Sequence, residues 1–104
     1  MKAEQLKGHL DSLILGTLSS GPAHGYAVIE ELKRRSAGAF DLAEGTVYPV
    51  LHRLEAEGLL ASAWTTASGR KRRVYRLTRR GRAALDGSRR EWRAFAQAVE
   101  AVLA

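Results

Sequence analysis

Arginine and lysine side chains are concentrated in one short stretch of the sequence. Residues 67–90 contain ten of them and a single acid, Asp86, whereas the rest of the chain contains seven bases and ten acids. Guanidinium and ammonium groups bind phosphate oxygens, so this local excess predicts a polyanionic partner. The net charge of +6 and the isoelectric point of about 10.3 agree with that prediction.

Other reactive side chains lack the spacing that catalysis or metal binding requires. The sequence has no cysteine, and its three histidines, His9, His24 and His52, are not spaced as metal ligands. It also lacks a phosphate loop and a nucleophile elbow. We therefore expect no enzymatic activity, no metal and no cofactor. Without a long apolar span or a signal-peptide pattern, the chain is predicted to be cytoplasmic.

Helical periodicity predicts four helices around one core. Apolar residues recur at helical spacing over four ranges: 4–19, 23–35, 44–57 and 79–103. With Thr46 as the N-cap of the third helix, Pro49 falls in the first turn, where proline is tolerated; if the helix starts earlier, Pro49 should distort its beginning. Thr78 is the expected N-cap of the last helix.

Between the third and fourth helices the pattern changes to that of strands. Residues 59–66 are rich in strand formers, residues 72–78 alternate in polarity, and residues 67–71 between them contain a glycine. The predicted fold is therefore mainly α with a small β-hairpin. Three helices followed by a basic hairpin and a further helix describe a winged helix-turn-helix, whose third helix enters the DNA major groove and whose hairpin is the wing.

The face of the third helix opposite its apolar arc carries small and polar side chains. We expect this face to be free of acids across the first two turns of the helix. Arg53 and His52 can donate to guanine acceptors or to phosphates, and Thr46 and Tyr48 can reach phosphate oxygens or a thymine methyl group. A base-reading role predicts that Arg53→Ala costs about 1–3 kcal/mol and alters sequence preference. The alternative is a weakly polar face of a core helix; the adjoining basic hairpin favours DNA contact.

Three stretches of the sequence resemble the PadR family of transcriptional regulators. They are GPAHGYAVIEELKRR at 21–35, LAEGTVYPVLHRLEAEGLL at 42–60 and SGRKRRVYRLTRRG at 68–81, in the family's order and spacing. The single short C-terminal helix looks like the compact branch of that family. The resemblance implies a homodimeric repressor that loses affinity for its DNA operator on binding a small, often aromatic effector.

The resemblance also implies a division of the chain and a set of DNA contacts. Residues 1–78 would form the DNA-binding domain and residues 79–104 the dimerisation helix, together one compact unit. The DNA-contacting residues carried over by position are Thr46, Tyr48, His52 and Arg53 on the helix and Arg70, Lys71 and Arg72 on the wing, with phosphate contacts added by Lys2 and Lys7.

The last predicted helix carries a short heptad seam. Leu85, Trp92 and Val99 are seven residues apart, and Phe95 and Val102 form the companion row. The seam is too short to hold a dimer alone, so it must also pack against the first helix. We expect a twofold interface built from Leu85, Trp92, Phe95, Val99, Val102 and Leu103.

Trp92 has two interpretations, which are packing within the seam and lining an effector pocket between subunits. Apolar clefts lined by aromatic residues bind small ligands, and the candidate lining here is Trp92, Phe95, Leu6 and Leu10. Arg89 lies three residues before Trp92, and no acid lies three or four residues after it. A neutral or anionic aromatic effector therefore fits at least as well as a cationic one.

Two other classes of function stay open on the sequence alone. The chain could be a basic winged-helix module that binds RNA, although modules reading single strands use exposed aromatic residues and only seven are present. It could also bind a protein partner through the same fold. Binding to phosphates weakens steeply as salt rises, so salt dependence separates the nucleic-acid functions from the protein-binding one.

Overall fold

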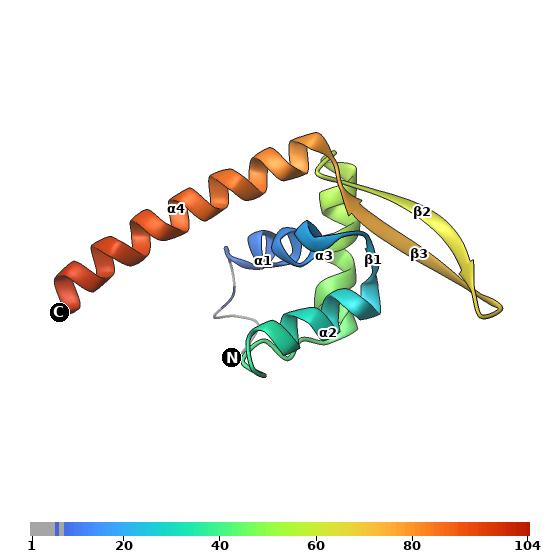
Figure 1. Ribbon diagram of the computed structural model, residues 1–104, viewed down its shortest axis with the longest axis horizontal. Helices are drawn as coiled ribbons and strands as arrows, with labels where there is room; N and C mark the ends of the chain where they lie inside the picture. The colour runs from blue at the N-terminus through green and yellow to red at the C-terminus, as the bar shows by residue number, and fades with distance from the viewer. Residues whose placement is uncertain (1–5, 7) are drawn as a thin grey trace.

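In the part of the chain that the structure describes, four α-helices combine with a three-stranded antiparallel sheet in an elongated molecule of 54 × 28 × 21 Å (Figure 1). The structure is a computed structural model that describes residue 6 and residues 8–104. The elements in chain order are α1 (Leu10–Thr17), the 3-10 turn η2 (Leu18–Ser20), β1 (Ala23–His24), α2 (Gly25–Arg35), α3 (Glu44–Ala56), β2 (Leu60–Ala67), β3 (Arg70–Leu77) and α4 (Arg79–Leu103).

The predicted hairpin is present, and its turn is shorter than expected. β2 and β3 pair in antiparallel register up to Ala67 opposite Arg70, so the turn consists of Ser68 and Gly69 instead of residues 67–71. Both turn residues have positive φ, +52° and +74°, as a type I′ turn requires. The right-handed twist of such a turn matches that of the strands, so pairing continues to the tip of the wing.

A third strand, β1, was not predicted and lies on the other edge of β3. Ala23 pairs with Tyr75, and His24 then caps α2 by accepting a hydrogen bond from the Ala27 N–H at its Nδ1, 3.2 Å away. α2 therefore starts at Gly25 and not at residue 23. Two residues are too few to show the alternation from which strands are predicted.

α1 also starts later than its periodicity predicted. Among the described residues the helix begins at Leu10, well after residue 4, and it ends by tightening into η2. Gly8 has a φ of +89°, outside the right-handed helical region, and thereby separates Leu6 from the helix. Leu6 is nevertheless buried, with 2% of its surface exposed.

The core is one cluster to which all four helices and the two long strands contribute. The buried arcs predicted for α2 and α3 are largely confirmed, with Val50 only partly buried. The most deeply buried large side chains are Ile14, Leu18, Val28, Val47, Leu51, Leu54 and Leu60. α1 lies centrally, in contact with α2, α3 and α4.

α3 starts earlier than Thr46 would allow as an N-cap. The N-cap is Ala43, which has no side-chain acceptor, and the Thr46 N–H already bonds to the Ala43 carbonyl at 3.0 Å within the first turn. Pro49 consequently lies inside the helix, where its missing N–H leaves the Gly45 carbonyl without its usual partner. Gly45 is exposed, so water can satisfy that carbonyl.

α4 begins as predicted, with Thr78 as its N-cap. Thr78 Oγ1 accepts a hydrogen bond from the Gly81 N–H at 3.0 Å and donates one to the Gly58 carbonyl at 2.7 Å. The C-terminal half of α4 extends beyond the rest of the molecule on one side, and the hairpin extends on the other (Figure 1). Within the described residues, no helix is both long and apolar enough to span a membrane.

Gly81 allows α4 to pack closely on the backbone before β2. A Cβ at this position would lie 2.0 Å from the Leu59 carbonyl oxygen, and backbone cannot move aside as a side chain can. We expect Gly81→Ala to lower the free energy of unfolding by about 3 kcal/mol. Gly87→Ala is the matched control, because its nearest atom is 3.9 Å away and alanine should stabilise the helix by up to about 1 kcal/mol. Urea denaturation measures both, and equal stabilities would contradict this packing.

Candidate nucleic-acid interface

A groove of about 630 Å³ lies between α3 and the hairpin. α3 contributes one wall, the hairpin contributes the other, and the first turn of α2 closes one end. The described lining residues are His24, Gly25, Tyr26, Glu44, Tyr48, His52, Trp64, Arg70, Lys71, Arg72, Arg73 and Tyr75. The groove thus brings together five of the sequence-predicted DNA contacts: Tyr48, His52, Arg70, Lys71 and Arg72.

The buried arc of α3 determines which of its residues face the groove. Successive helix residues are 100° apart, so Tyr48 and Arg53 project from opposite flanks of α3. Tyr48 lies on the flank toward the hairpin, whereas Thr46 and Arg53 lie on the flank toward α1 and do not line the groove. His52 is exposed between these two flanks. The predicted helix contacts are therefore divided between two sides of α3.

Tyr48 packs its ring against the backbone at the start of α2. A Cβ at Gly25 would come within 2.1 Å of the Tyr48 ring, so only glycine leaves room for this contact. Burial, together with the nearby Glu44 carboxylate, raises the pKa of Tyr48 above its usual value. The phenol therefore stays protonated at neutral pH and can donate a hydrogen bond to a phosphate oxygen.

Arg73 connects the hairpin to α3 and was not predicted as part of the site. Its Nη2 donates to Glu55 Oε1 at 3.0 Å and its Nε donates to Ser62 Oγ at 2.8 Å, while Ser62 donates to Glu55 Oε2 at 2.6 Å. The hydrogen bond from Ser62, aided by Arg73, lowers the pKa of Glu55 and keeps it ionised. The guanidinium also lies over the Trp64 ring, 5.7 Å from its centroid. Arg73 thus holds the wing at a fixed position beside α3.

Arg72 approaches the residue that caps α2. Its Nη1 lies 2.8 Å from His24 Nε2. Burial and the charge of Arg72 lower the pKa of His24, which favours the neutral ring. A neutral imidazole has one acceptor nitrogen, so it can accept from the Ala27 N–H at Nδ1 or from Arg72 at Nε2, but not from both at once. When Nδ1 caps α2, the N–H groups of Arg72 are available to a phosphate.

The polar groups that line the groove are mainly hydrogen-bond donors, with one acidic side chain among them. Glu44, in the first turn of α3, also lines the groove, beside the face that was expected to be free of acids. Within the described part of the chain, no group of three or more potential ligands could hold a metal ion. The remaining polar groups are guanidinium, ammonium, phenol and imidazole, which bind phosphate oxygens and base edges.

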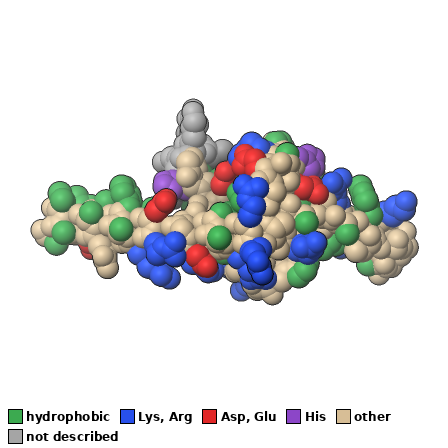
Figure 2. Space-filling view, turned by 90° about the horizontal axis from the view of Figure 1, so that it is seen from above, with side chains coloured by type: hydrophobic (Ala, Val, Ile, Leu, Met, Phe, Trp, Pro, Cys, Tyr) green, Lys and Arg blue, Asp and Glu red, His purple; other side chains and the backbone are tan. Residues whose placement is uncertain are grey.

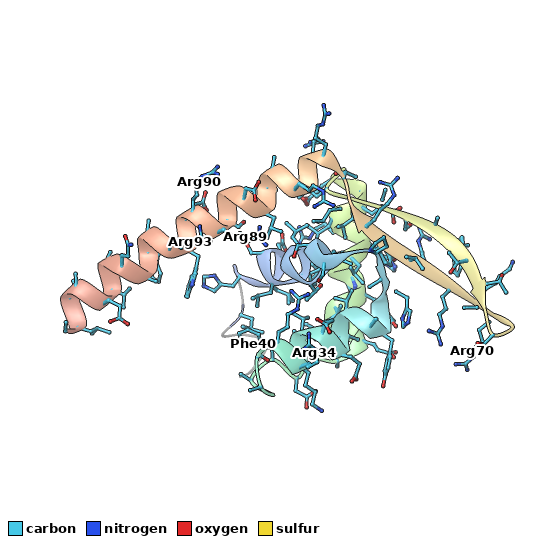
Figure 3. All side chains as sticks on the ribbon, viewed as in Figure 1. Arg34, Phe40, Arg70, Arg89, Arg90 and Arg93 are labelled. Atoms are coloured by element: carbon cyan, nitrogen blue, oxygen red, sulfur yellow. The ribbon has the colours of Figure 1, made fainter. Side chains whose placement is uncertain are left out.

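The basic cluster identified in the sequence is divided between two parts of the molecule. Half of its members belong to the hairpin, and the other half lie on α4, which runs away from the groove (Figure 3). The hairpin carries Arg70, Lys71, Arg72, Arg73 and Arg76, and α4 carries Arg79, Arg80, Arg82, Arg89 and Arg90. The predicted contacts Lys2 and Lys7 lie outside the described residues.

A second, more apolar cleft of about 540 Å³ lies between α1 and α4. The described residues that line it are Leu6, Gly8, His9, Ser12, Leu13, Phe40, Ser88, Glu91, Trp92 and Phe95. Three of the four candidate effector residues are among them, and Leu10 is not. His9 packs edge-on against Trp92, with ring centroids 5.7 Å apart. Glu91, directly before Trp92, also lines this cleft. It is an acid that the spacing of three and four residues from Trp92 did not predict.

The outer part of α4 presents an uncovered apolar face. Trp92 is 55% exposed and Phe95 58%, and Val99, Val102 and Leu103 are exposed as well. Figure 2 shows hydrophobic side chains gathered at the end of the molecule that α4 forms. Leu85, predicted to belong to the same face, is 4% exposed and packs into the core of its own chain. It therefore offers almost no surface to a partner.

Comparison with known proteins identifies one family. The model of the transcriptional regulator PadR-like family matches residues 14–87. The Mycobacterium tuberculosis protein named Transcriptional regulator Rv3488 is 44% identical over 86 residues, which are 83% of this chain and 78% of that protein.

Solved structures of PadR proteins have the same fold. A PadR family regulator from Clostridium difficile superposes with a TM-score of 0.82 at 31% identity, covering 93% of this chain and 100% of its own. Bacillus subtilis PadR, solved in complex with operator DNA, superposes with a TM-score of 0.69 at 26% identity, covering 76% of this chain and 45% of its own.

Proposed function

This chain belongs to the PadR-like family, so it is a transcriptional regulator and not an enzyme, and we propose that it acts as a homodimeric, ligand-responsive repressor bound to a DNA operator. The groove between α3 and the hairpin is the observation that carries this proposal. It gathers Tyr48, His52, Arg70, Lys71 and Arg72 from two separate elements on one concave surface. The relative from Bacillus subtilis, which binds operator DNA, supports it.

The proposed docking places α3 in the major groove, which is wide enough for one helix. One strand of the DNA backbone then separates α3 from the wing and enters the groove between them. Tyr48 and His52 would contact this backbone strand from the helix. Thr46, on the other flank of α3, would reach the opposite wall of the DNA major groove. Arg70, Lys71 and Arg72 would bind its phosphates, and phosphate contacts position a protein without reading sequence.

The proposed dimer uses the uncovered apolar face of α4. Large exposed apolar side chains in a row are unusual on a monomer and mark interaction surfaces. The first of them, Trp92, also faces α1, so a second copy would cover both helices. We accordingly assign residues 1–78 to DNA binding and residues 79–104 to dimerisation. Two recognition helices held at a fixed separation would engage two half-sites about one helical turn apart, or a multiple of it.

The cleft between α1 and α4 is the proposed effector site. Trp92 and Phe95 offer aromatic surface and Leu6 and Leu13 offer apolar surface, which suits a small aromatic molecule. Such a ligand would lie between the elements that set the separation of the two recognition helices. A change in that separation would weaken simultaneous contact with both half-sites, and the operator would be released.

Selection of bound duplexes from a random pool tests this function directly. We expect a selected sequence with twofold symmetry, bound far more tightly than either of its single strands or an RNA of the same sequence. A panel of aromatic compounds is then screened for quenching of tryptophan fluorescence and for displacement of the duplex. Preference for RNA, or binding that does not depend on salt, would rule out the operator-binding function.

A further inference from the structure

Arg53 lies on the recognition helix, yet its guanidinium is directed toward α1. Its Nη2 donates to Asp11 Oδ1 at 2.6 Å and its Nη1 donates to Asp11 Oδ2 at 3.1 Å, which makes a bidentate pair between residues 42 positions apart. Nη1 also donates to Glu57 Oε1 at 3.0 Å, one turn further along α3. Bidentate pairs of this kind fix geometry because both groups are planar.

The charge balance around Arg53 disfavours a contact with DNA. Two carboxylates face one guanidinium, so the cluster as a whole is negative. Hydrogen bonds from the Arg53 guanidinium to Asp11 and Glu57 raise the pKa of Arg53 above its usual value, because both carboxylates stabilise the charged form. The two carboxylates accept three hydrogen bonds from the guanidinium, so a phosphate or a guanine would compete with them for this side chain.

Asp11 occupies a connecting position in the fold. It lies in the first turn of α1, between His9 and Ser12, which both line the cleft against α4. The pair Asp11–Arg53 therefore links the helix beneath that cleft to the recognition helix. α1 and α3 also pack against each other through apolar core side chains, whose burial is favourable but not directional.

We propose that Arg53 is a positioning residue, which acts through Asp11 to fix the orientation of α3 relative to α1. The proposal rests on the proposed function in one respect, namely that α3 is the helix presented to DNA. It removes Arg53 from the residues expected to read bases. Movement of α1 would then be passed to the recognition helix through this pair.

The test compares Asp11→Asn, Arg53→Gln and the double variant, with Asp41→Asn as the matched control. Asp41 is exposed, its nearest basic partner is Lys33 at 3.8 Å, and its replacement removes the same charge as Asp11→Asn. Loss of a negative charge by itself favours DNA binding, so the control should bind the selected duplex as tightly as wild type or more tightly. Urea denaturation confirms that all four variants are folded at the assay temperature.

We expect Asp11→Asn and Arg53→Gln each to weaken binding about three- to tenfold, with no further loss in the double variant and no change in base preference. In DNA-free protein, both should shift the same backbone amide NMR signals of α3, and Asp41→Asn should leave them in place. Tighter binding by Asp11→Asn, a preference altered at one base pair by Arg53→Gln, or unshifted α3 signals would overturn the proposal. A wild-type protein that binds no duplex would instead overturn the proposed function, and the NMR comparison would still decide the positioning role.

Discussion

Replacing Phe95 with glutamate is expected to separate the proposed homodimer into monomers of 11.4 kDa. Phe95 is 58% exposed and lies beside Trp92, with ring centroids 5.9 Å apart. A carboxylate at this position would lose its water when a second copy covers α4, at a cost of several kcal/mol. A twofold interface contains the substitution twice, so the dimer dissociation constant should rise at least a hundredfold.

The same variant should lose operator binding although the groove is untouched. When two half-sites are bound by a linked pair of protomers, the second contact is intramolecular and adds a factor of roughly 10² to 10⁴. A monomer binds a single half-site and forfeits that factor. Phe95→Glu should therefore retain weak, salt-sensitive binding to any duplex while its preference for the symmetric operator disappears.

Gln97→Glu is the control for this experiment. It adds the same charge to the same helix, but its position is about 160° around the helix axis from Phe95, and it is exposed. Light scattering coupled to gel filtration measures the mass, and fluorescence anisotropy measures operator affinity. A dimeric Phe95→Glu protein, or a Gln97→Glu protein that dissociates equally, would contradict a dimer formed through the apolar face of α4.

The parts of the fold that were predictable from the sequence are those that bury an apolar face of their own. α2, α3 and α4 each carry apolar residues at a spacing of three and four, and the hairpin alternates with a period of two. Thr78 was identified as the N-cap of α4 because capping depends on residues close in sequence. These features depend on residues that are close in sequence, so they can be recognised without knowledge of the tertiary structure.

What could not be predicted depends on contacts between distant residues. β1 is a strand only because β3 lies beside it, and Ala43 caps α3 without any side-chain signal. Arg53 and Asp11 are 42 positions apart, so helical periodicity placed Arg53 on an exposed flank but could not show its partner. In the run from Arg70 to Arg73, the register of the sheet places Arg73 against Glu55, whereas Arg70 and Lys71 stay exposed at the tip of the hairpin.

Neutralising the tip of the wing with Arg70→Gln and Lys71→Gln is expected to weaken binding to every duplex. Both side chains are exposed at the end of the hairpin and line the groove. Removing one bond to a phosphate should flatten the plot of log affinity against log salt by about one unit, so the slope should fall by about two for each protomer. Base preference should persist, because phosphate contacts orient the protein without reading sequence.

Arg90→Gln with Arg93→Gln removes the same charge from the middle of α4, and Figure 3 shows both residues on the opposite side of the molecule from Arg70. Screening limits the attraction between exposed charges to about 8 Å at physiological salt, so the loss of charges on α4 that lie far from the duplex should change its binding little. Direct binding of phosphates, in contrast, is weakened only at the wing. Anisotropy titrations from 50 to 200 mM salt should therefore show a flatter slope for the wing pair and a near wild-type slope for the α4 pair. Equal slopes for the two would mean that net charge, and not the wing, holds the duplex.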